Sequence, residues 1–273
     1  MPEGDTIFRT ATTLRRWLVE REISAARTTA PVPIELLVGD AVDAVDARAK
    51  HLLMRFSSGR VLHTHMQMSG AWHVYPGGAR WRRPAWRARV VLEAGERVAV
   101  CFDAPVVELL APGGEQLHPA LAALGPDVLV EPLDLAAVLA RAAQRSPETE
   151  IGELLLDQRV VGGIGNIYRS EALFLTGVHP RRRAADVDVG AVVSVAAGLM
   201  RAAAGLSARP GLRGSSPAGP YVYRRAGRPC RRCGARIEAG RVGAQARTAY
   251  WCPRCQPLGS RVPATPAGGG GGG

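Results

Sequence analysis

Four of the five cysteines in this chain form two Cys-x2-Cys pairs, and their spacing constrains the fold more than any other feature. Cys230 and Cys233 are followed, after 18 residues, by Cys252 and Cys255. This spacing is typical of a four-thiolate zinc site with a structural role, because four thiolates leave no open coordination position. A redox Cys-x2-Cys pair is the rival interpretation. The spacing favours one structural Zn²⁺ ion in a β-hairpin finger, with Arg247 five residues before the third ligand.

Basic residues are unevenly distributed, both in position and in type. Lys and Arg total 35 against 24 Asp and Glu, and from residue 200 onward there are 13 arginines and one acid, Glu238. Such a basic region is typical of a protein that binds nucleic acid, the alternative being a segment that only maintains solubility. The only lysine is Lys50. Unless it was retained by chance, it indicates a site that needs a compact or deprotonatable amine.

The chain carries no pattern for crossing or leaving a membrane. No apolar run approaches the roughly 18 residues that a membrane span needs. The first ten residues, MPEGDTIFRT, lack the basic flank and apolar stretch of a secretion signal. We therefore expect a cytoplasmic protein without a membrane partner.

The first half of the chain predicts one helix followed by antiparallel strands. Residues 3–20 carry apolar side chains at helical spacing, with Asp5 as the expected N-cap. From about 22 to 111, short alternating stretches predict about eight strands, with hairpin turns at 58–59 and 94–95. This pattern favours a β-sandwich.

The second half predicts helices and then a small cysteine-bearing unit. The candidate helices cover 133–145, 148–158, 166–176 and 188–204. The Pro-, Gly- and Ser-rich stretch 207–220 is typical of a linker or loop. The chain ends in six glycines, which cannot pack a core, so we expect this tail to be disordered.

A glycine-rich turn precedes the helix predicted at 166–176. Residues 160–166 read VVGGIGN, in which the glycines permit a tight turn and Asn166 is a strong N-cap. A helix N-terminus of this kind offers free N–H groups to a phosphate. A helix–turn–helix with an ordinary cap fits the same residues. Beside a basic finger, the turn becomes a candidate clamp on the DNA backbone.

The N-terminus offers a candidate nucleophile. Removal of Met1 would leave Pro2 with a free secondary amine, whose pKa of ~8 lies below the ~10.4 of lysine. Attack of this amine on a sugar C1′ gives a cationic iminium that acidifies the C2′ proton. Glu3 follows directly and is placed to shuttle protons. The alternative is an ordinary chain start.

Together these segments resemble the formamidopyrimidine-DNA glycosylase/endonuclease VIII family along nearly the whole chain. The matching segments are PEGD (2–5), the isolated Lys50, LGPD (124–127), LLDQRVVGGIGNIYRSEALF (155–174) and RTAYWCPRCQ (247–256). They occur in the order and spacing of the family, which makes the resemblance highly specific.

The resemblance implies an α+β multidomain fold. An N-terminal helix plus antiparallel β-sandwich would form a catalytic domain over 1–125, followed by a helix–two-turns–helix DNA-binding domain over 126–220. A four-cysteine zinc finger would cover 221–256, and 257–273 would be the disordered Gly-rich tail.

The implied activity is that of a bifunctional DNA glycosylase and abasic-site lyase of base excision repair. By the resemblance, Pro2 is the Schiff-base nucleophile and Glu3 is the proton donor for base release. Lys50 binds phosphate and supports β-elimination, and Arg247 binds phosphate and supports δ-elimination. Asn166 grips the phosphate of the lesion strand. The damaged nucleotide must leave the stack, because C1′ is unreachable inside the duplex.

The residues distinguish between the two branches of the family. The chain begins PEGDT, where the formamidopyrimidine branch has PELPE, and CFDAPVVELL (101–110) lacks the void-filling Arg and Phe of that branch. Gln67, Met68 and Ser69 resemble the wedge segment of endonuclease VIII, with Met68 as the best intercalator. The chain therefore resembles the actinobacterial-like endonuclease VIII branch, which favours oxidised pyrimidines over 8-oxoguanine as substrates.

Two positions depart from the family pattern. Thr6 stands where many relatives carry a second glutamate, and Ala123 stands where endonuclease VIII relatives can offer a DNA-binding arginine. The alternatives left open are 8-oxoguanine or formamidopyrimidine specificity, an abasic-site lyase, and a non-catalytic DNA-binding module. The resemblance implies a monomer that binds damaged duplex or single-stranded DNA in the bacterial cytoplasm, associated with the nucleoid.

Overall fold

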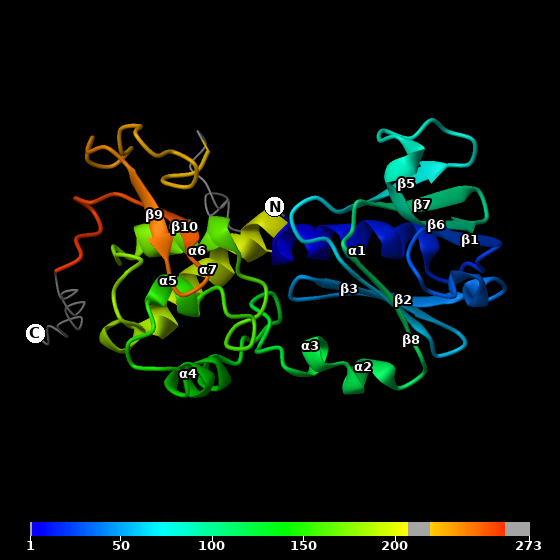
Figure 1. The fold of residues 1–273 in the computed structure, drawn as a ribbon, viewed down its shortest axis with the longest axis horizontal. Coiled ribbons are helices and arrows are strands. Elements are labelled where there is room, and N and C mark those ends of the chain that lie inside the picture. The colour runs from blue at the N-terminus through cyan, green and yellow to red at the C-terminus, as the bar shows by residue number, and fades with distance from the viewer. Residues whose placement is uncertain (1, 207–218, 260–273) are drawn as a thin grey trace, which may run out of the picture.

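The protein has two lobes, with the N-terminus between them (Figure 1). This computed structural model describes residues 2–206 and 219–259. Eight strands with the first helix make one lobe, and the helices of the second half of the chain with a β-hairpin make the other. Nearly all of the predicted linker, and the predicted disordered tail beyond residue 259, lie outside the described residues.

The strand lobe is a sandwich of two four-stranded antiparallel sheets, as the sequence predicts. One sheet has the order β1-β6-β7-β5, from Ala25–Thr28, Ala88–Ala94, Arg97–Phe102 and Ala71–Pro76. The other has the order β2-β3-β4-β8, from Val42–Arg48, His51–Phe56, Val61–His65 and Val106–Leu110. The predicted turns at 58–59 and 94–95 join β3 to β4 and β6 to β7.

Helix α1 (Gly4–Leu18) packs its apolar face into the core of the sandwich. Its buried residues include Ile7, Ala11, Leu14 and Leu18, which recur at helical spacing and lie in one cluster with both sheets. The prediction of Asp5 as the N-cap is wrong. Asp5 lies inside the first turn, and the extended backbone at the N-cap position belongs to Glu3.

Short helices connect the major elements. They are the 3₁₀ helices η1 (Ile34–Leu37), η2 (Ala85–Arg87) and η3 (Ala184–Asp186), and the four-residue helices α2 (Gly114–Leu117) and α3 (Pro119–Ala122). The sequence does not predict α2 and α3, because one helical turn carries no periodicity. These two helices lie against the β2-β3-β4-β8 sheet, where Leu121 joins a small cluster with Leu53 and Val61.

The second lobe contains α4 (Leu135–Ala143), α5 (Ile151–Leu154), α6 (Asn166–Leu175) and α7 (Val189–Ala204). Asp134 and Asp188 cap α4 and α7 through their side chains, accepting from backbone N–H groups three residues on. The helix predicted over 148–158 is only α5, because the chain turns back into the glycine-rich segment. No helix among residues 2–206 and 219–259 is long and apolar enough to cross a membrane.

The finger is a hairpin of β9 (Glu238–Val242) and β10 (Arg247–Trp251). Two buried side chains fasten it to the helical lobe. The carboxylate of Glu171 on α6 accepts hydrogen bonds from the backbone N–H groups of residues 221–223, at 2.7–3.0 Å. Gln256 accepts from the backbone N–H of Cys252 and donates to the carbonyl of Val178.

Candidate active site

The carboxylate of Glu3 is buried against the N-terminus of α6. Its side chain is 1% exposed, and its two oxygens accept hydrogen bonds from the backbone N–H groups of Ile167, at 2.8 Å, and Tyr168, at 3.4 Å. The positive end of the helix dipole favours this carboxylate. These contacts contradict the expectation that the α6 N-terminus offers free N–H groups to a phosphate, because Glu3 occupies two of them.

Glycines make this close approach possible. A Cβ on Gly165 would lie 2.3 Å from Cδ of Glu3, so no other residue fits there without displacing the carboxylate. Gly163, at φ +98°, adopts a backbone conformation that favours glycine, and its carbonyl accepts a hydrogen bond from the N–H of Gly4 at 3.1 Å. The glycine-rich turn is therefore built around the N-terminal segment.

Lys50 reaches this junction at the tip of the β2–β3 hairpin. The preceding residue, Ala49, has φ +55°, and its N–H donates to Oδ2 of Asp127 at 2.6 Å. A Cβ on Gly162 would lie 2.9 Å from Cβ of Ala49, so the hairpin packs directly on the glycine-rich turn. The two lobes thus bring Lys50 towards Glu3.

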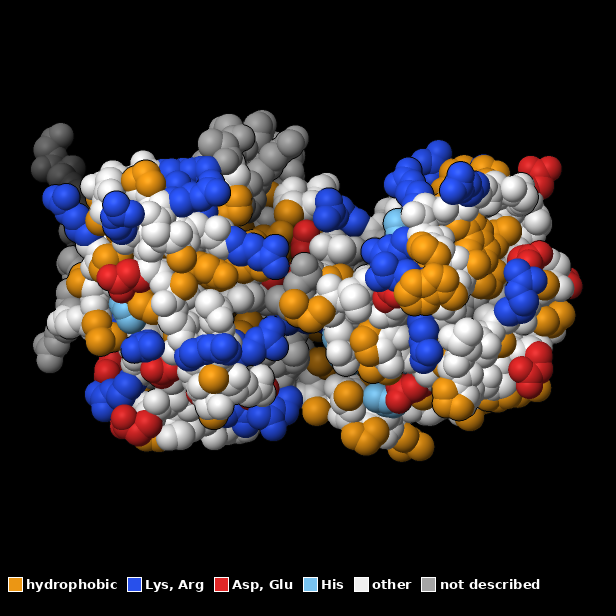
Figure 2. All heavy atoms as spheres, turned by 45° about the horizontal axis from the view of Figure 1, so that its top comes forward, with side chains coloured by type: hydrophobic (Ala, Val, Ile, Leu, Met, Phe, Trp, Pro, Cys, Tyr) orange, Lys and Arg blue, Asp and Glu red, His pale blue; other side chains and the backbone are white. Residues whose placement is uncertain are grey.

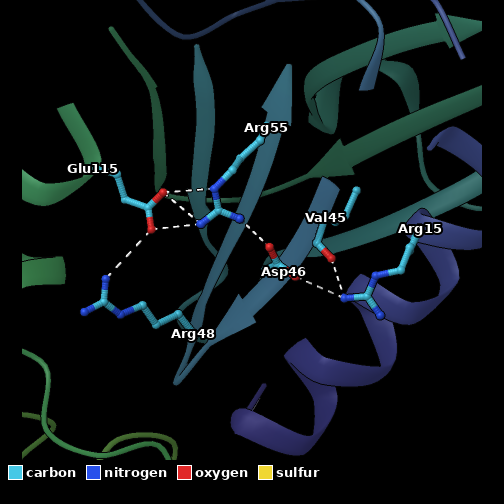
Figure 3. A network of polar contacts seen from close by, with 6 residues as sticks. All are labelled: Arg15, Val45, Asp46, Arg48, Arg55 and Glu115. Carbon is cyan, nitrogen blue, oxygen red and sulfur yellow. Dashed lines mark hydrogen bonds and ion pairs between the residues drawn. The ribbon is translucent and has the colours of Figure 1, made fainter. Parts of the chain in front are cut away.

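A network of charged side chains anchors the hairpin that carries Lys50 (Figure 3). Arg55 on β3 binds Glu115 on α2 at 2.8 Å and also binds Asp46 on β2. Arg15 on α1 donates to the carbonyl of Val45 at 2.6 Å, and Arg48 lies 3.8 Å from Glu115. Helices on both sides of the sheet therefore brace the hairpin.

Burial shifts the pKa values of both ionisable groups at the junction. Burial raises the pKa of Glu3, although the N–H of Ile167 and the charge of Lys50 oppose this rise. Burial lowers the pKa of Lys50 to about 8, the charge of Glu3 opposes this shift, and the charge of Arg247 adds to it. Such paired shifts are typical of catalytic acids and bases.

Asn166 begins α6 and joins it to the finger. Its Nδ2 donates to the carbonyl of Thr248 at 2.9 Å, and Gly165, not Asn166, is at the N-cap position. Arg169, which is fully buried, donates to the same carbonyl at 2.6 Å and to Oδ1 of Asn166. Arg247 begins β10 next to Thr248 and is exposed. The finger therefore presents Arg247 at the junction.

Pro2 is half-buried and directly precedes Glu3, so its nitrogen lies at the same junction. The first residue of α1 is two positions further on. Gly4 is hydrogen-bonded to the glycine-rich turn of the helical lobe, and this bond limits where Pro2, two residues earlier, can lie.

The predicted wedge lies on the loop between β4 and β5 and is separate from the junction. Gln67, Met68 and Ser69 are all exposed, and the side chain of Met68 is 61% exposed. Gln67 has φ +44°, and its N–H donates to Nδ1 of His65 at 3.2 Å. Arg83 donates to the carbonyl of Ser69 at 3.0 Å. The loop therefore presents an apolar side chain to solvent.

The four predicted metal ligands come together. The Sγ atoms of Cys230, Cys233, Cys252 and Cys255 lie within 4.8 Å of one another, with pairs at 3.5 and 4.0 Å. A tetrahedral ion with Zn–S bonds of about 2.3 Å separates its sulfurs by ~3.8 Å. Backbone N–H groups donate to the sulfurs of Cys230 and Cys252. The cluster can therefore hold a metal ion, and Zn²⁺ fits it.

The surface is hollowed between the two lobes, and basic side chains gather on both lobes beside the hollow (Figure 2). This distribution suits a polyanion that lies across both lobes.

The sequence does not indicate the roles of three further residues at the junction. Asp127 holds the Lys50 hairpin, and Arg169 joins α6 to the finger. His65 lies close enough to Lys50 for the lysine charge to add to the lowering of its pKa, which burial brings to about 4. The available signals were the position of Asp127 in the LGPD segment and an arginine within the predicted helix, in YRSEALF.

Comparison with known proteins agrees with this arrangement. The family model of the formamidopyrimidine-DNA glycosylase N-terminal domain matches residues 1–104, and that of the H2TH domain matches residues 124–206. The chain is 37% identical to a probable endonuclease 8 2 of Streptomyces coelicolor, over 94% of each chain. It is 34% identical to the DNA-(apurinic or apyrimidinic site) lyase Nei2 of Mycolicibacterium smegmatis, covering 94% of this chain and 99% of that one.

A solved structure shares the fold. Lactococcus lactis Fpg (MutM), in a complex with DNA that contains N7-benzyl-Fapy-dG, superimposes with a TM-score of 0.78 at 22% identity. The match covers 94% of this chain and 100% of that chain. From the two domain matches and the full-length relatives, we conclude that the chain belongs to the formamidopyrimidine-DNA glycosylase and endonuclease VIII family.

Proposed function

We propose that this protein, a DNA glycosylase and abasic-site lyase of base excision repair, removes oxidised pyrimidines from DNA through the amine of Pro2. The observation that carries the proposal is the buried Glu3 carboxylate on the α6 N-terminus, one residue from Pro2 and electrostatically coupled to Lys50. A DNA-binding module without catalysis has no use for a carboxylic acid of raised pKa beside an amine of lowered pKa.

The chemistry assigns one role to each group. The Pro2 nitrogen forms a bond to C1′ and loses its proton as the glycosidic C1′–N bond breaks and the base leaves protonated. The C1′–O4′ bond of the sugar then opens, with Glu3 donating a proton to O4′. The resulting iminium withdraws electrons, so the C2′ proton is lost and the C3′–O bond breaks, with the 3′-phosphate as leaving group. In the second elimination the C4′ proton is lost and the C5′–O bond breaks, with the 5′-phosphate as leaving group. Lys50 binds phosphate and supports the first elimination, and Arg247 binds phosphate and supports the second.

We assign DNA binding to three parts of the molecule. Asn166 contacts the lesion-strand phosphate from the start of α6. Gln67, Met68 and Ser69 fill the space that the everted nucleotide leaves. The finger presents Arg247, and its four cysteines hold one structural Zn²⁺, which supplies folding energy and no chemistry. The protein acts as a monomer in the bacterial cytoplasm, at the nucleoid.

The substrate preference rests on the wedge and on what β7 and β8 lack. Met68 supplies an apolar intercalator, whereas CFDAPVVELL offers no arginine–phenylalanine pair to face an orphaned cytosine. This combination favours oxidised pyrimidines over 8-oxoguanine.

The test is borohydride trapping of the protein, with Pro2 confirmed as its first residue by mass spectrometry. Three duplexes are compared, containing thymine glycol, 8-oxoguanine or a preformed abasic site. Adducts on the thymine glycol and abasic duplexes, with weak trapping on 8-oxoguanine, support the proposal. An adduct on the abasic duplex alone indicates a lyase, a preference for 8-oxoguanine overturns the substrate assignment, and no adduct on any duplex overturns the nucleophile.

A further inference from the structure

A second cluster of potential metal ligands lies on the sandwich, away from the cysteines. Nδ1 of His63 lies 2.7 Å from Oε2 of Glu108, and Nε2 of His118 lies 3.0 Å from the same oxygen. His51 extends the cluster, with its Nδ1 2.8 Å from Nε2 of His63, and the ring of His65 stands edge-on to His51 at 4.7 Å. Four of the six histidines of the chain therefore lie together.

The register of the β2-β3-β4-β8 sheet creates this cluster. His63 on β4 is directly opposite Glu108 on β8, and His51 on β3 is directly opposite His65. His118 comes from the start of α3, which lies over the same face. The Arg55–Glu115 ion pair holds the preceding helix, α2, on this sheet (Figure 3). His118 directly follows α2 and is therefore held close to Glu108.

We propose that His63, Glu108 and His118 form a binding site for a divalent transition-metal ion of the Zn²⁺ class, separate from the finger. Two imidazole nitrogens and a carboxylate oxygen are a donor set that such ions accept, with water completing the shell. Ligands about 2.1 Å from an ion are separated by roughly 3.0–3.4 Å. The observed 2.7 and 3.0 Å contacts need to widen by only a few tenths of an ångström to admit one.

Binding of an ion changes which ring nitrogen of each histidine carries the proton. In the metal-free cluster, His63 Nδ1 and His118 Nε2 each donate a proton to Glu108. When an ion binds, His63 carries its proton on Nε2 and donates it to Nδ1 of His51, and His51 in turn carries its own proton on Nε2. His118 moves its proton to Nδ1 and loses its long 3.4 Å contact with the N–H of Leu121. His51 is thus an outer-shell partner of the kind that orients metal-bound histidines.

Exposure and charge also suit an ion. The side chain of Glu108 is 43% exposed and that of His118 is 17% exposed, whereas His63 is 2% exposed. An ion therefore reaches the site from solvent on the Glu108 side and binds the buried His63 on the other side. The second carboxylate nearby, Glu115, offsets the positive charge of Arg48 and Arg55.

The test counts zinc ions per chain in the untagged, full-length protein with its finger loaded. After equilibration with Zn²⁺ and removal of excess, wild type should retain two ions per chain. Glu108→Gln and His118→Asn should each retain one, and His73→Asn, a histidine outside the cluster, should retain two. The first two variants alter exposed or half-buried groups, so circular dichroism should show an unchanged fold.

A Co²⁺ titration separates the two sites by their ligands. The finger gives thiolate-to-cobalt charge transfer, whereas the proposed site adds ligand-field bands of nitrogen and oxygen ligands alone. Those bands should be lost in Glu108→Gln and His118→Asn while the thiolate bands remain. One ion per wild-type chain would overturn the proposal, and so would a second ion retained by both variants or lost in His73→Asn.

Discussion

The junction around Glu3 and the loop around Met68 are built in opposite ways. At the junction, groups from residues far apart in the sequence are buried and hydrogen-bonded to one another, and the Glu3 carboxylate is 1% exposed. On the loop, Met68 is 61% exposed and the few hydrogen bonds are made by its neighbours. Both regions face the same DNA in the proposed function.

The difference teaches what each task demands of the fold. A proton donor must be fixed to within a fraction of an ångström and must have a shifted pKa, and burial between two lobes provides both. An intercalating side chain must enter the base stack, so it needs exposure and an apolar surface. Substitutions at the junction should therefore change the chemistry on every substrate, whereas substitutions on the loop should matter only where a stack must be opened.

The largest effect is expected from Glu3→Gln. The amide cannot donate a carboxylic proton, so base excision should fall by ~10²–10⁴-fold, the range for loss of a general acid. Trapping on a preformed abasic site should persist, because Pro2 is unchanged. Single-turnover kinetics on lesion and abasic duplexes measure both, and Glu35→Gln, at an exposed position, is the matched control. Equal loss on both duplexes would show that Glu3 acts mainly by holding the lobes together.

Gly165→Ala should break the junction without removing any functional group. The added Cβ would lie 2.3 Å from the Glu3 carboxyl carbon and must displace it. A misplacement of about 1 Å costs on the order of 10²-fold in rate. Activity should fall on all substrates while Zn²⁺ content stays constant.

The control is Gly198→Ala, where a Cβ meets no atom within 4 Å. Alanine suits the interior of α7, so this variant should be active and more stable by roughly 0.5–1 kcal/mol, measured by chemical unfolding. Wild-type activity in Gly165→Ala would contradict the requirement for a closely packed junction.

The charge of the buried Lys50 should make DNA affinity depend on pH. Burial lowers its pKa to about 8 from an ordinary value of 10.5, so it loses its charge as the pH rises through about 8. A phosphate binds the charged form, so DNA affinity should fall above that pH, by at most about tenfold per pH unit. In Lys50→Arg, fluorescence anisotropy should show no such fall, because arginine stays charged. An identical pH profile in both proteins would exclude Lys50 as the titrating group.

Met68→Ala should give the smallest effect and sharpen the comparison. Burying a methionine side chain in an opened stack contributes about 1.5 kcal/mol, so excision from duplex DNA should fall about tenfold. Excision from single-stranded DNA should change little. Leu117→Ala, on the exposed surface of α2, should leave both rates unchanged. Equal losses on the two substrates would show that Met68 does not act by entering the stack.

The sequence predicts the elements whose signal is local. The two Cys-x2-Cys pairs predict the cluster, because each knuckle is formed by adjacent residues. The alternating stretches predict eight strands, and the start of α6 follows from the glycines before Asn166. The sole lysine, Lys50, is found at the junction.

The missed features depend on contacts between distant segments. The N–H of Ile167 at the start of α6 donates to the carboxylate of Glu3, 164 positions earlier. The local sequence therefore suggests free N–H groups at the start of α6, whereas Glu3 accepts from them. The wrong assignment of Asp5 as the N-cap has the same origin. The N–H of Gly4 donates to the carbonyl of Gly163 in the distant glycine-rich turn, and α1 begins at Gly4, one residue before Asp5. The histidine cluster depends on strand register, which no spacing along the chain encodes.

The placement of Glu3 also bears on the order of events during synthesis. Its partners on α6 are the N–H groups of Ile167 and Tyr168, so a nascent chain that ends before them carries an undocked acid. In such a chain Glu3 keeps its ordinary acidity, and the amine of Pro2 has no proton donor held beside it. In the proposed mechanism, the chain therefore becomes able to release a damaged base only after its second lobe has been made and has closed on the first.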